Sequence, residues 1–508
     1  MIHNYVENNI KQEVPAADSS SEEDDEDEYT YTDCSESEDS GLVISERKYK
    51  ADVTNGIKDD AHSDVPLTEF SGDEKKTAKY FNDWTRALAN SDKEIVKELQ
   101  ENYGETFPEC TVEQEPEKTI VNFIGEKDEE GKMHGEVEIN YENGDYFWGD
   151  YIHGVREGMA SIVLKNGDNY VGNFRNGYLE GTVNETLTFC DRENVQREVY
   201  YSKGVRHGFY REILPGGQVW AVGRFVNGRK DGVHWCWSRG NCFLVGSVDD
   251  DNKPHGDGIY YLYPDLTTTL CGDFTHGKMG TGSIVKLTGV QIECGIPIPK
   301  HRKSENPTTY TYDPSGARCI SKTPLVRDPY EARYVYVAES GIEGAGEGLW
   351  AKTSLMAGQV CSLFNGVRQH HLWGSSAMTD NKPWSDYRIG CQKDLDLDIL
   401  PEHISTTNYR ATLAHKTSTS FTPNCHFAQF WHPRFGLIMS IVADRDIMAG
   451  EEIFVCYNYV MALAPAWYQE QWFKHLREEL RWTEEQIHSW AARMNKLNGL
   501  TVNIPPPF

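Results

Sequence analysis

Residues 143–154 read N-G-D-Y-F-W-G-D-Y-I-H-G, and residues 166–177 follow the same plan as N-G-D-N-Y-V-G-N-F-R-N-G. In each line aromatic or aliphatic residues alternate with polar ones before a glycine, which predicts a β-strand followed by a turn. Residue pairs ending in glycine recur in steps of 23, 23, 27, 24, 24 and 24 residues, at Gly135, Gly158, Gly181, Gly208, Gly232, Gly256 and Gly280. This period predicts one β-hairpin per repeat over residues 126–295, stacked into a continuous sheet, with the glycine that ends each line supplying the positive φ that the turn needs.

The bulk composition limits what the rest of the chain can be. A chain of 508 residues is too long for one hydrophobic core, and its 79 Asp and Glu against 50 Lys and Arg give a net charge of −29. Such a charge argues against a general basic surface for nucleic acid and favours a basic protein partner. The twelve cysteines form no C-x-x-C pair, so we expect no metal site and reduced thiols in a nucleocytoplasmic protein. We expect neither a signal peptide nor a membrane span, because no long apolar run occurs.

Two segments precede the repeats. The stretch from Asp18 to Asp39 holds twelve acidic residues and no Lys or Arg, which predicts a disordered acidic tail over residues 1–70. It is either a solubilising tail or an electrostatic lure for a basic substrate. Residues 71–125 are predicted to be helical, with a break at residues 90–92. Apolar positions spaced near 3.6 indicate these helices, and they are Tyr80, Phe81, Trp84, Leu88, Ile95, Val96 and Leu99.

The sequence changes character after the repeats. Residues 296–327 begin I-P-I-P-K-H-R-K-S-E-N-P, which predicts a linker whose basic cluster is either a weak nuclear import signal or a solvated turn. An alternating strand is expected at Tyr334–Ala338, followed by a glycine-rich turn at Gly344–Gly348. A strand-like stretch follows this turn where a dinucleotide fingerprint would have a helix, so the turn does not predict a Rossmann fold.

Further motifs follow in a fixed order: S-L-F-N-G-V-R (362–368), S-F-T-P-N-C (420–425), W-H-P-R-F-G (431–436), A-G-E-E-I-F-V-C-Y-N-Y (449–459) and A-W-Y-Q (466–469). Together with the glycine-rich turn they resemble a SET domain, and the hairpin repeats before them resemble MORN repeats. The chain thus resembles the MORN-repeat SET-domain protein-lysine methyltransferases over roughly residues 130–475.

The resemblance implies a mostly β fold with a SET domain over residues 328–465, a knot-like crossing, and a C-terminal helical segment over 466–508. It implies that S-adenosylmethionine binds on one face and that the target lysine enters by a narrow channel from the other. The implied partner is a protein with an exposed lysine, with histone tails as the family default. It also implies a protein of the nucleus and/or cytoplasm, associated with chromatin if histones are its substrate.

The resemblance also implies roles for individual residues. Tyr457 and Tyr459 match the paired tyrosines of the channel and active site, and we expect them to be catalytic. Phe364 and Phe427 stand where the mono-methylating relatives place channel tyrosines. The implied cofactor-binding residues are Ala345, Gly346, Glu347, His415, Lys416, Ser418, Thr419, Trp467 and Gln471. Among these, Trp467 matches the aromatic residue that stacks on adenine.

Three of these positions depart from the family pattern. Ser418 and Thr419 replace the Asn and His of the usual N-H-S-x-x-P-N motif, and Gln471 stands where a Glu is expected near the cofactor. One interpretation is a lysine methyltransferase with weakened cofactor binding. The alternative is a SET-fold pseudoenzyme that serves as a MORN-repeat scaffold for protein partners. In that alternative, the tyrosines and phenylalanines named above are apolar residues of the strands.

Overall fold

A computed structural model describes eight segments of the chain and five single positions near its C-terminus. The segments are 72–89, 118–189, 192–303, 307–342, 344–370, 387–392, 395–457 and 466–498, and the single positions are Met461, Ala464, Val502, Ile504 and Pro505. The expected acidic tail over residues 1–70 lies outside this part of the chain. So do the predicted helix break at residues 90–92 and Tyr459.

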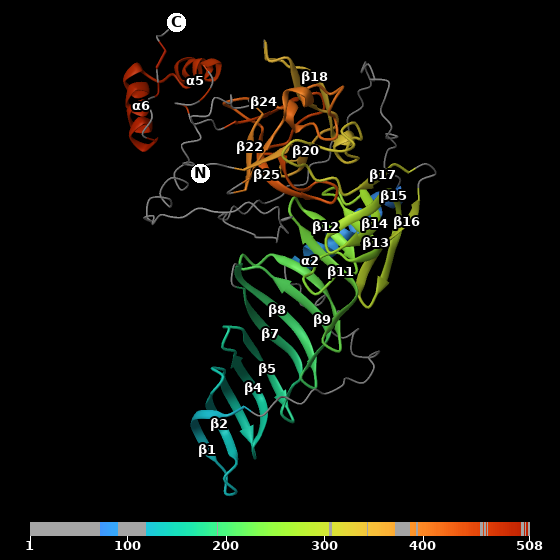
Figure 1. The fold of residues 1–508 in the computed structure, drawn as a ribbon, viewed down its shortest axis with the longest axis vertical. Helices are drawn as coiled ribbons and strands as arrows, with labels where there is room; N and C mark the ends of the chain where they lie inside the picture. Colours follow the sequence, from blue (N-terminus) through green and yellow to red (C-terminus); the bar gives the residue numbers. More distant parts are fainter. Residues whose placement is uncertain are drawn as a thin grey trace, which may run out of the picture. The chain divides into compact units, whose positions relative to one another are not determined.

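The first described element is the helix α2 (Gly72–Ala89), which confirms the start of the predicted helical segment. Its apolar face packs on the repeat sheet, because the rings of Phe81 and Trp84 lie 5.2 and 5.1 Å from the ring of Trp235. Phe81 and Leu88 have no exposed surface. Figure 1 shows α2 in blue beside the strands of the sheet's later half. The apolar side chains at helical spacing therefore form one face of the helix, and this face packs on the sheet.

The repeats form a 17-stranded sheet, as their period predicts (Figure 1). Its strands are β1 (Ile120–Lys127), β2 (Met133–Tyr141), β3 (Tyr146–Ile152), β4 (Val155–Val163), β5 (Asn169–Arg175), β6 (Tyr178–Leu179), β7 (Gly181–Phe189), β8 (Arg192–Ser202), β9 (Val205–Ile213), β10 (Val219–Val226), β11 (Arg229–Ser238), β12 (Cys242–Gly246), β13 (Gly256–Leu262), β14 (Thr269–Thr275), β15 (Lys278–Glu293), β16 (Ile296–Lys303) and β17 (Thr309–Thr311). Successive strands pair antiparallel wherever their register is described, as hairpin connections require.

Glycine supplies positive φ in the turns that end the quoted lines, as predicted, with φ of 84° at Gly154 and 87° at Gly177. The glycines used to count the period lie outside these turns. The turn between β3 and β4 is formed by His153 and Gly154, both with positive φ, at 48° and 84°. Gly158 lies four residues further on, where the pairing of β3 with β4 shifts register between Gly149 and Tyr151. Its φ of 79° belongs to a β-bulge. The repeat thus contains two glycines with positive φ, one in the turn and one in the β-bulge. The glycine pairs counted in the sequence mark the bulge.

The expected linker over residues 296–327 is also wrong in its first part. The strands β16 and β17 fall within it, and both pair with the 16-residue strand β15. Prolines at 297 and 299 had suggested irregular structure, but a strand at the edge of a sheet tolerates residues without an N–H donor. The carbonyl of Pro297 accepts a 2.7 Å hydrogen bond from the Trp235 indole. The basic cluster at residues 300–303 therefore lies in a strand rather than a turn.

Three small sheets follow in the second half of the chain. The first contains β18 (Val335–Glu339), β19 (Glu347–Ala351), β27 (Glu452–Val455) and β24 (Ser418–Thr419), the second β20 (Val360–Phe364), β26 (Gly436–Ala443) and β25 (Cys425–His432), and the third β21 (Val367–His370), β23 (Leu395–Asp398) and β22 (Ile389–Gln392). Short helical turns lie between them at α4 (Glu331–Tyr334), η2 (Pro401–His403) and η3 (Ala414–Lys416). The fold class is therefore mostly β, as expected.

Two stretches far apart in sequence run side by side in the first of these sheets. The strand β24 pairs parallel with β27, matching Ser418 with Phe454 and Thr419 with Val455. The side-chain amide of Asn424 binds β27 through both its nitrogen and its oxygen, because it donates to the Glu452 carbonyl at 2.9 Å and accepts from the Phe454 N–H at 2.8 Å. A threaded crossing of the chain requires this kind of contact.

The last strands of the repeat sheet share buried hydrogen bonds with the second half of the chain. The Tyr263 hydroxyl lies 2.7 Å from Asp328 and 3.1 Å from His432 Nε2, and His432 lies 2.9 Å from the same carboxylate. The Tyr261 hydroxyl donates to the Trp431 carbonyl at 2.8 Å. All of these groups but Trp431 are almost completely buried, so the contacts belong to a common core.

The expected C-terminal helices are present as α5 (Ala466–Glu478) and α6 (Glu484–Asn498). They pack on each other through Phe473, Leu476 and Ile487, none of which is exposed. No helix in the described part of the chain is long and apolar enough to cross a membrane.

Candidate active site

One cavity brings together several of the segments that suggested a methyltransferase site, although S-F-T-P-N-C, W-H-P-R-F-G, the glycine-rich turn and the C-terminal helix contribute no lining residue. It is lined by Phe364, Tyr387, Arg388, Ile389, Ala414, His415, Thr417, Phe427 and Tyr457. These residues come from β20, from the approach to β22, from η3, from β25 and from the end of β27. Strand pairing within the small sheets is what places such distant stretches around one space.

Phe364 and Phe427 form one aromatic part of the lining. Their ring centroids lie 6.3 Å apart with the planes at 83°, an edge-to-face arrangement. Phe364 is 3% exposed, and Phe427 is partly buried. Both side chains border the cavity, so neither is simply core packing directed away from it.

Tyr457 binds the crossing through both its side chain and its backbone. Its hydroxyl donates to the Thr417 carbonyl at 2.7 Å, and its N–H donates to the Thr419 hydroxyl at 3.3 Å. The phenol is therefore held against η3 at the edge of the cavity. Tyr459, which the resemblance makes the second site tyrosine, lies outside the described residues.

His415 and Lys416 lie next to each other in η3 but face different surroundings. Burial lowers the pKa of His415 to about 3, with a further contribution from the nearby Lys416 charge, so the imidazole is neutral at physiological pH. Lys416 forms a 2.6 Å ion pair with Glu347, at the start of β19. The Lys416 side chain is 6% exposed and that of Glu347 is 49% exposed. The ion pair joins the two segments from which we expected cofactor contacts.

The glycine-rich turn is open to solvent and is anchored from behind. Ala345, Gly346 and Glu347 are exposed, and a side-chain carbon added at Gly346 would meet no atom within 4 Å. Behind the turn, the buried Glu452 carboxylate accepts hydrogen bonds from the Ser340 hydroxyl at 2.6 Å and the Gly341 N–H at 2.8 Å. Within the turn, the Ala345 N–H donates to the Ile342 carbonyl at 3.1 Å and the Gly346 carbonyl accepts the Ser340 N–H at 2.7 Å. The turn is therefore an ordered, solvent-exposed segment whose base is held by β27.

Ser418 and Thr419, the two departures from the family motif, differ in their surroundings. Ser418 is partly buried, whereas Thr419 is 8% exposed and its hydroxyl accepts the Tyr457 N–H. Thr419 thus has a structural role in the crossing that a larger side chain would disturb.

Trp467 and Gln471 are both exposed on α5, and neither lines the cavity. The helix instead contacts the S-F-T-P-N-C motif through Phe421, whose ring lies 5.1 Å from the rings of Tyr468 and Trp472 and 5.2 Å from that of His475. The structure therefore brings α5 to the motif but does not bring Trp467 to the cavity.

Sequence reasoning missed several residues around the site. Tyr387 and Arg388 line the cavity, but their stretch has no motif that would have indicated it. Glu452 belongs to the quoted motif A-G-E-E-I-F, but the motif does not indicate that this residue anchors the glycine-rich turn. Glu331 is buried behind the cavity wall, where its carboxylate accepts hydrogen bonds from Ser362 and from the Leu363 and Leu413 N–H groups, both at 2.9 Å.

Comparison with known proteins agrees with this architecture. The family described as "Histone H3 K4-specific methyltransferase SET7 N-terminal" matches residues 111–154 and 225–294, and the SET-domain family matches residues 329–458. These matches cover much of the repeat sheet and the small sheets around the cavity, which defines a SET-domain protein with a SET7-type N-terminal region. A relative from Halocynthia roretzi, "Histone-lysine N-methyltransferase SETD7", is 35% identical over 362 residues, or 69% of this chain and 91% of the relative. The chain therefore belongs to the SET7-like family of histone-lysine methyltransferases.

Proposed function

We propose that the protein is an S-adenosylmethionine-dependent protein-lysine N-methyltransferase. The observation that carries the proposal is the single cavity shared by Phe364, Phe427, Tyr457 and the neutral His415. An aromatic channel beside a cofactor site is what methyl transfer to an amine needs, because positioning and exclusion of water supply much of the rate. Membership of the SET7-like family supports the same conclusion.

The residues present fit a cofactor with one positive charge and a polar amino-acid end. The solvent-exposed turn at Ala345 and Gly346, the Glu347–Lys416 pair and the Ser418 hydroxyl would hold it, all within the two expected cofactor segments. When bound, S-adenosylmethionine supplies an electrophilic methyl group. The neutral state of His415 avoids a second positive charge beside that group.

The cavity walls would prepare the target lysine. A lysine ammonium has an ordinary pKa of about 10.4 and must lose a proton before it can act as a nucleophile. The apolar rings of Phe364 and Phe427 disfavour the charged form by excluding water, and the guanidinium of Arg388 on the same wall disfavours a second cation. Arg388 itself is held by Asp396 at 2.7 Å. These groups favour the neutral amine at the reacting end of the channel.

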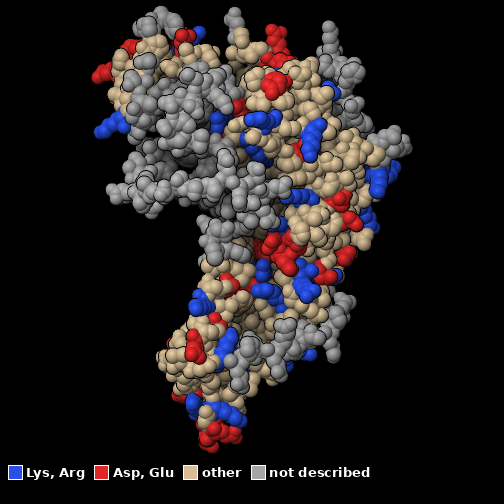
Figure 2. Space-filling view, viewed as in Figure 1, with Lys and Arg blue, Asp and Glu red and all other residues tan. Residues whose placement is uncertain are grey.

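The substrate we propose is a basic protein segment, with a histone tail as the first choice. Its positive charge would match the net charge of −29. On the face that Figure 2 shows, acidic and basic side chains are mixed and form no single acidic surface. A histone substrate would place the protein at chromatin in the nucleus.

The alternative is a SET-fold scaffold without methyl transfer. The intact cavity and the family membership favour the enzyme, because a scaffold has no need of a lined channel beside the cofactor segments. The two hypotheses differ in cofactor binding, which calorimetry on the full chain measures directly. Heat of binding from S-adenosylmethionine supports the enzyme, and no binding at millimolar cofactor supports the scaffold.

Mass spectrometry of histones and peptide arrays after incubation with labelled cofactor then tests transfer itself. We expect the protein without substitutions to transfer label to a lysine of the substrate. Binding of cofactor with no label on any basic peptide would contradict the histone part of the proposal while leaving the cofactor site intact.

A further inference from the structure

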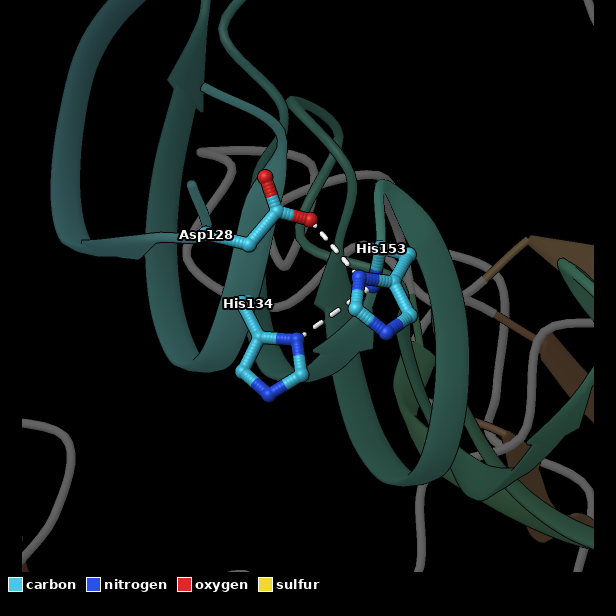
Figure 3. A group of neighbouring side chains, drawn as sticks. All are labelled: Asp128, His134 and His153. Carbon is cyan, nitrogen blue, oxygen red and sulfur yellow. Dashed lines mark hydrogen bonds and ion pairs between the residues drawn. The ribbon is translucent and has the colours of Figure 1, made fainter. Parts of the chain in front are cut away.

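A cluster of potential metal ligands lies at the first hairpins of the repeat sheet, far in sequence from the cavity (Figure 3). It contains Asp128 from the β1–β2 turn, His134 from β2 and His153 from the β3–β4 turn. The Nδ1 atom of His153 lies 2.7 Å from the Asp128 carboxylate, and the two imidazole rings lie 5.0 Å apart. One ligand atom from each residue lies within 4.8 Å of the others.

The fold of the repeat does not require these imidazoles. His134 Nδ1 accepts the His153 backbone N–H at 3.4 Å, which stabilises the turn. Glutamates make the same contact in the next two repeats, where Glu157 accepts the Asn176 N–H at 2.9 Å and Glu180 accepts the Lys203 N–H at 2.8 Å. A carboxylate is thus sufficient for the turn, and two facing imidazoles beside a carboxylate need another explanation.

We propose that Asp128, His134 and His153 bind a divalent transition-metal ion of the zinc class, with solvent completing the coordination. Two imidazoles and a carboxylate are a ligand set that Zn²⁺ accepts, and such sites leave a position open for water. The ion would connect the β1–β2 turn to the β3–β4 turn. This site has no connection to methyl transfer and goes beyond the proposed function.

The surroundings of the cluster suit an ion. The other carboxylate oxygen of Asp128 accepts the N–H groups of Glu130 at 3.0 Å and Lys132 at 2.9 Å, which orients the carboxylate toward the histidines. Zinc bonds of about 2.0–2.2 Å require the ligand atoms to close further. The His153 side chain is 67% exposed and free of packing that would prevent this movement.

A second cluster with the same plan serves as an internal comparison. His276 lies 2.7 Å from Asp249 and its N–H lies 3.3 Å from His255 Nδ1, with the two rings 4.4 Å apart. Among the described residues, however, only the Asp128 group brings three such donor atoms within 4.8 Å of one another. We therefore assign the ion to the first cluster and not to the second.

The sequence alone predicted no metal, because that prediction looked for paired cysteines. His134 and His153 are nineteen residues apart and meet only because β2 pairs with β3, which matches Gly135 with Tyr151.

The test is a calorimetric titration with Zn²⁺ of the full chain, from which any tag has been removed and any bound metal has been taken up by a chelator. Residues 1–70 hold 20 Asp and Glu against 5 Lys and Arg and could attract Zn²⁺ non-specifically. Excess Mg²⁺ competes for these carboxylates, and 0.15 M salt screens their charge. We expect one ion per chain. Substitution with Co²⁺ should give the visible absorption of a site with nitrogen ligands.

The repeats supply substitutions that keep the turns. His153→Asn places the residue found at Asn176 and Asn227, which share its positive φ. His134→Gln keeps an acceptor for the turn N–H, and Asp128→Asn keeps one side-chain oxygen, that of the amide, as an acceptor. Each change should weaken Zn²⁺ binding more than about tenfold, since even groups that only orient a ligand contribute ten- to a hundred-fold.

The matched control is His276→Asn, which makes the same change in the second cluster and should leave Zn²⁺ affinity unchanged. Circular dichroism checks that every variant is folded. Absence of specific Zn²⁺ binding, binding that survives all three changes at the first cluster, or equal loss in His276→Asn would each overturn the assignment.

Discussion

The Nζ atom of Lys416 lies 2.6 Å from a carboxylate oxygen of Glu347, and the pair connects the two chain segments from which the sequence predicts cofactor contacts. The segments are 69 residues apart along the chain. Because the Lys416 side chain is almost fully buried, its charge needs a compensating partner, and within the described segments Glu347 is the carboxylate that pairs with it. The pair therefore fixes the relative position of the glycine-rich turn and η3.

We predict that Glu347→Gln destabilises the protein and weakens cofactor binding. The change leaves a buried ammonium with a neutral partner, which should cost about 1–3 kcal/mol, between the values for an exposed and a buried ion pair. Urea unfolding measures the stability, and calorimetry measures the cofactor affinity.

The control for this prediction is Asp83→Asn on α2. Lys79 and Asp83 are also 2.6 Å apart, but their side chains are 76% and 56% exposed. An exposed pair contributes little, so this change should cost less than about 1 kcal/mol. Equal effects of the two substitutions would contradict the role given to the Glu347–Lys416 pair.

Glu331 predicts a dependence of stability on pH. Burial raises its pKa from an ordinary value of 4.5 to about 8, although three hydrogen bonds to its carboxylate oppose the shift. The folded protein therefore holds a proton that the unfolded chain releases above pH 4.5. The stabilisation from this group is complete below pH 4.5 and is lost as the pH rises toward 8, with a slope of up to about 1.4 kcal/mol per pH unit.

Glu331→Gln should remove this slope, because the amide does not titrate and keeps an oxygen for the same donors. Denaturation midpoints between pH 5 and pH 9 check the result, with the exposed Glu470→Gln on α5 as control. An unchanged slope in Glu331→Gln would show that another group carries the pH dependence.

The sequence predicted the repeat sheet because its period is local. Alternation and glycine spacing are features of single hairpins, and stacking follows once each hairpin has an apolar face. The same local signal could not separate Gly154 from Gly158, since both have positive φ and only strand register distinguishes a turn from a bulge. The linker prediction failed because prolines 297 and 299 indicate a break in sequence, whereas an edge strand accepts them.

The candidate site was predictable only where a motif marks it. Phe364 and Tyr457 lie in quoted motifs, Phe427 lies between two of them, and all three meet around one cavity. Arg388 lies in an unmarked stretch, and strand pairing alone brings it there. Glu331 was missed for a different reason, because a buried carboxylate that receives its hydrogen bonds from residues 363 and 413 has no local signature.

Ser418 and Thr419 replace the usual Asn and His of the cofactor motif, and we expect different results when each is changed back to the usual residue. Ser418→Asn restores an amide at a partly buried position, and we predict about ten- to a hundred-fold tighter cofactor binding from one added hydrogen bond to a charged group. Thr419→His should destabilise the protein by about 1–3 kcal/mol, because it removes the acceptor of the Tyr457 N–H from a buried site. The sequence alone suggested restoring both residues, whereas the structure favours the first.

Calorimetry with S-adenosylmethionine and thermal unfolding of the two single variants separate these effects. Thr419→Ser, which keeps the hydroxyl, is the control for the second change and should retain stability. No gain in affinity from Ser418→Asn would mean that the departure at this position does not limit cofactor binding.

We predict that Tyr459→Phe strongly reduces methyl transfer without unfolding the protein. By resemblance, the hydroxyl of this tyrosine orients the reacting centre. The comparison is Tyr457→Phe, whose lost hydroxyl breaks the hydrogen bond to the Thr417 carbonyl and should cost about 0.5–1.5 kcal/mol of stability. Turnover on a peptide substrate and urea unfolding distinguish the two roles, and full turnover by Tyr459→Phe would contradict the first.

The number of methyl groups transferred should depend on Phe364 and Phe427. In the mono-methylating relatives, tyrosine hydroxyls at these two positions hold the lysine amine in one orientation, so that a methylated amine has no room to turn. Here both rings line the cavity at a centroid separation of 6.3 Å and neither carries a hydroxyl. Each missing oxygen leaves space and removes a hydrogen-bond partner of the amine.

We therefore predict that the unmodified protein proceeds to di- or tri-methyl-lysine, and that Phe364→Tyr combined with Phe427→Tyr returns it toward one methyl group. Phe454→Tyr on β27 adds a hydroxyl away from the cavity lining and should leave the product unchanged. Intact-mass analysis of a peptide substrate at long times and excess cofactor gives the distribution. Strict mono-methylation by the unmodified protein would contradict the prediction, because the space left by the two missing hydroxyls would then have no effect on the product.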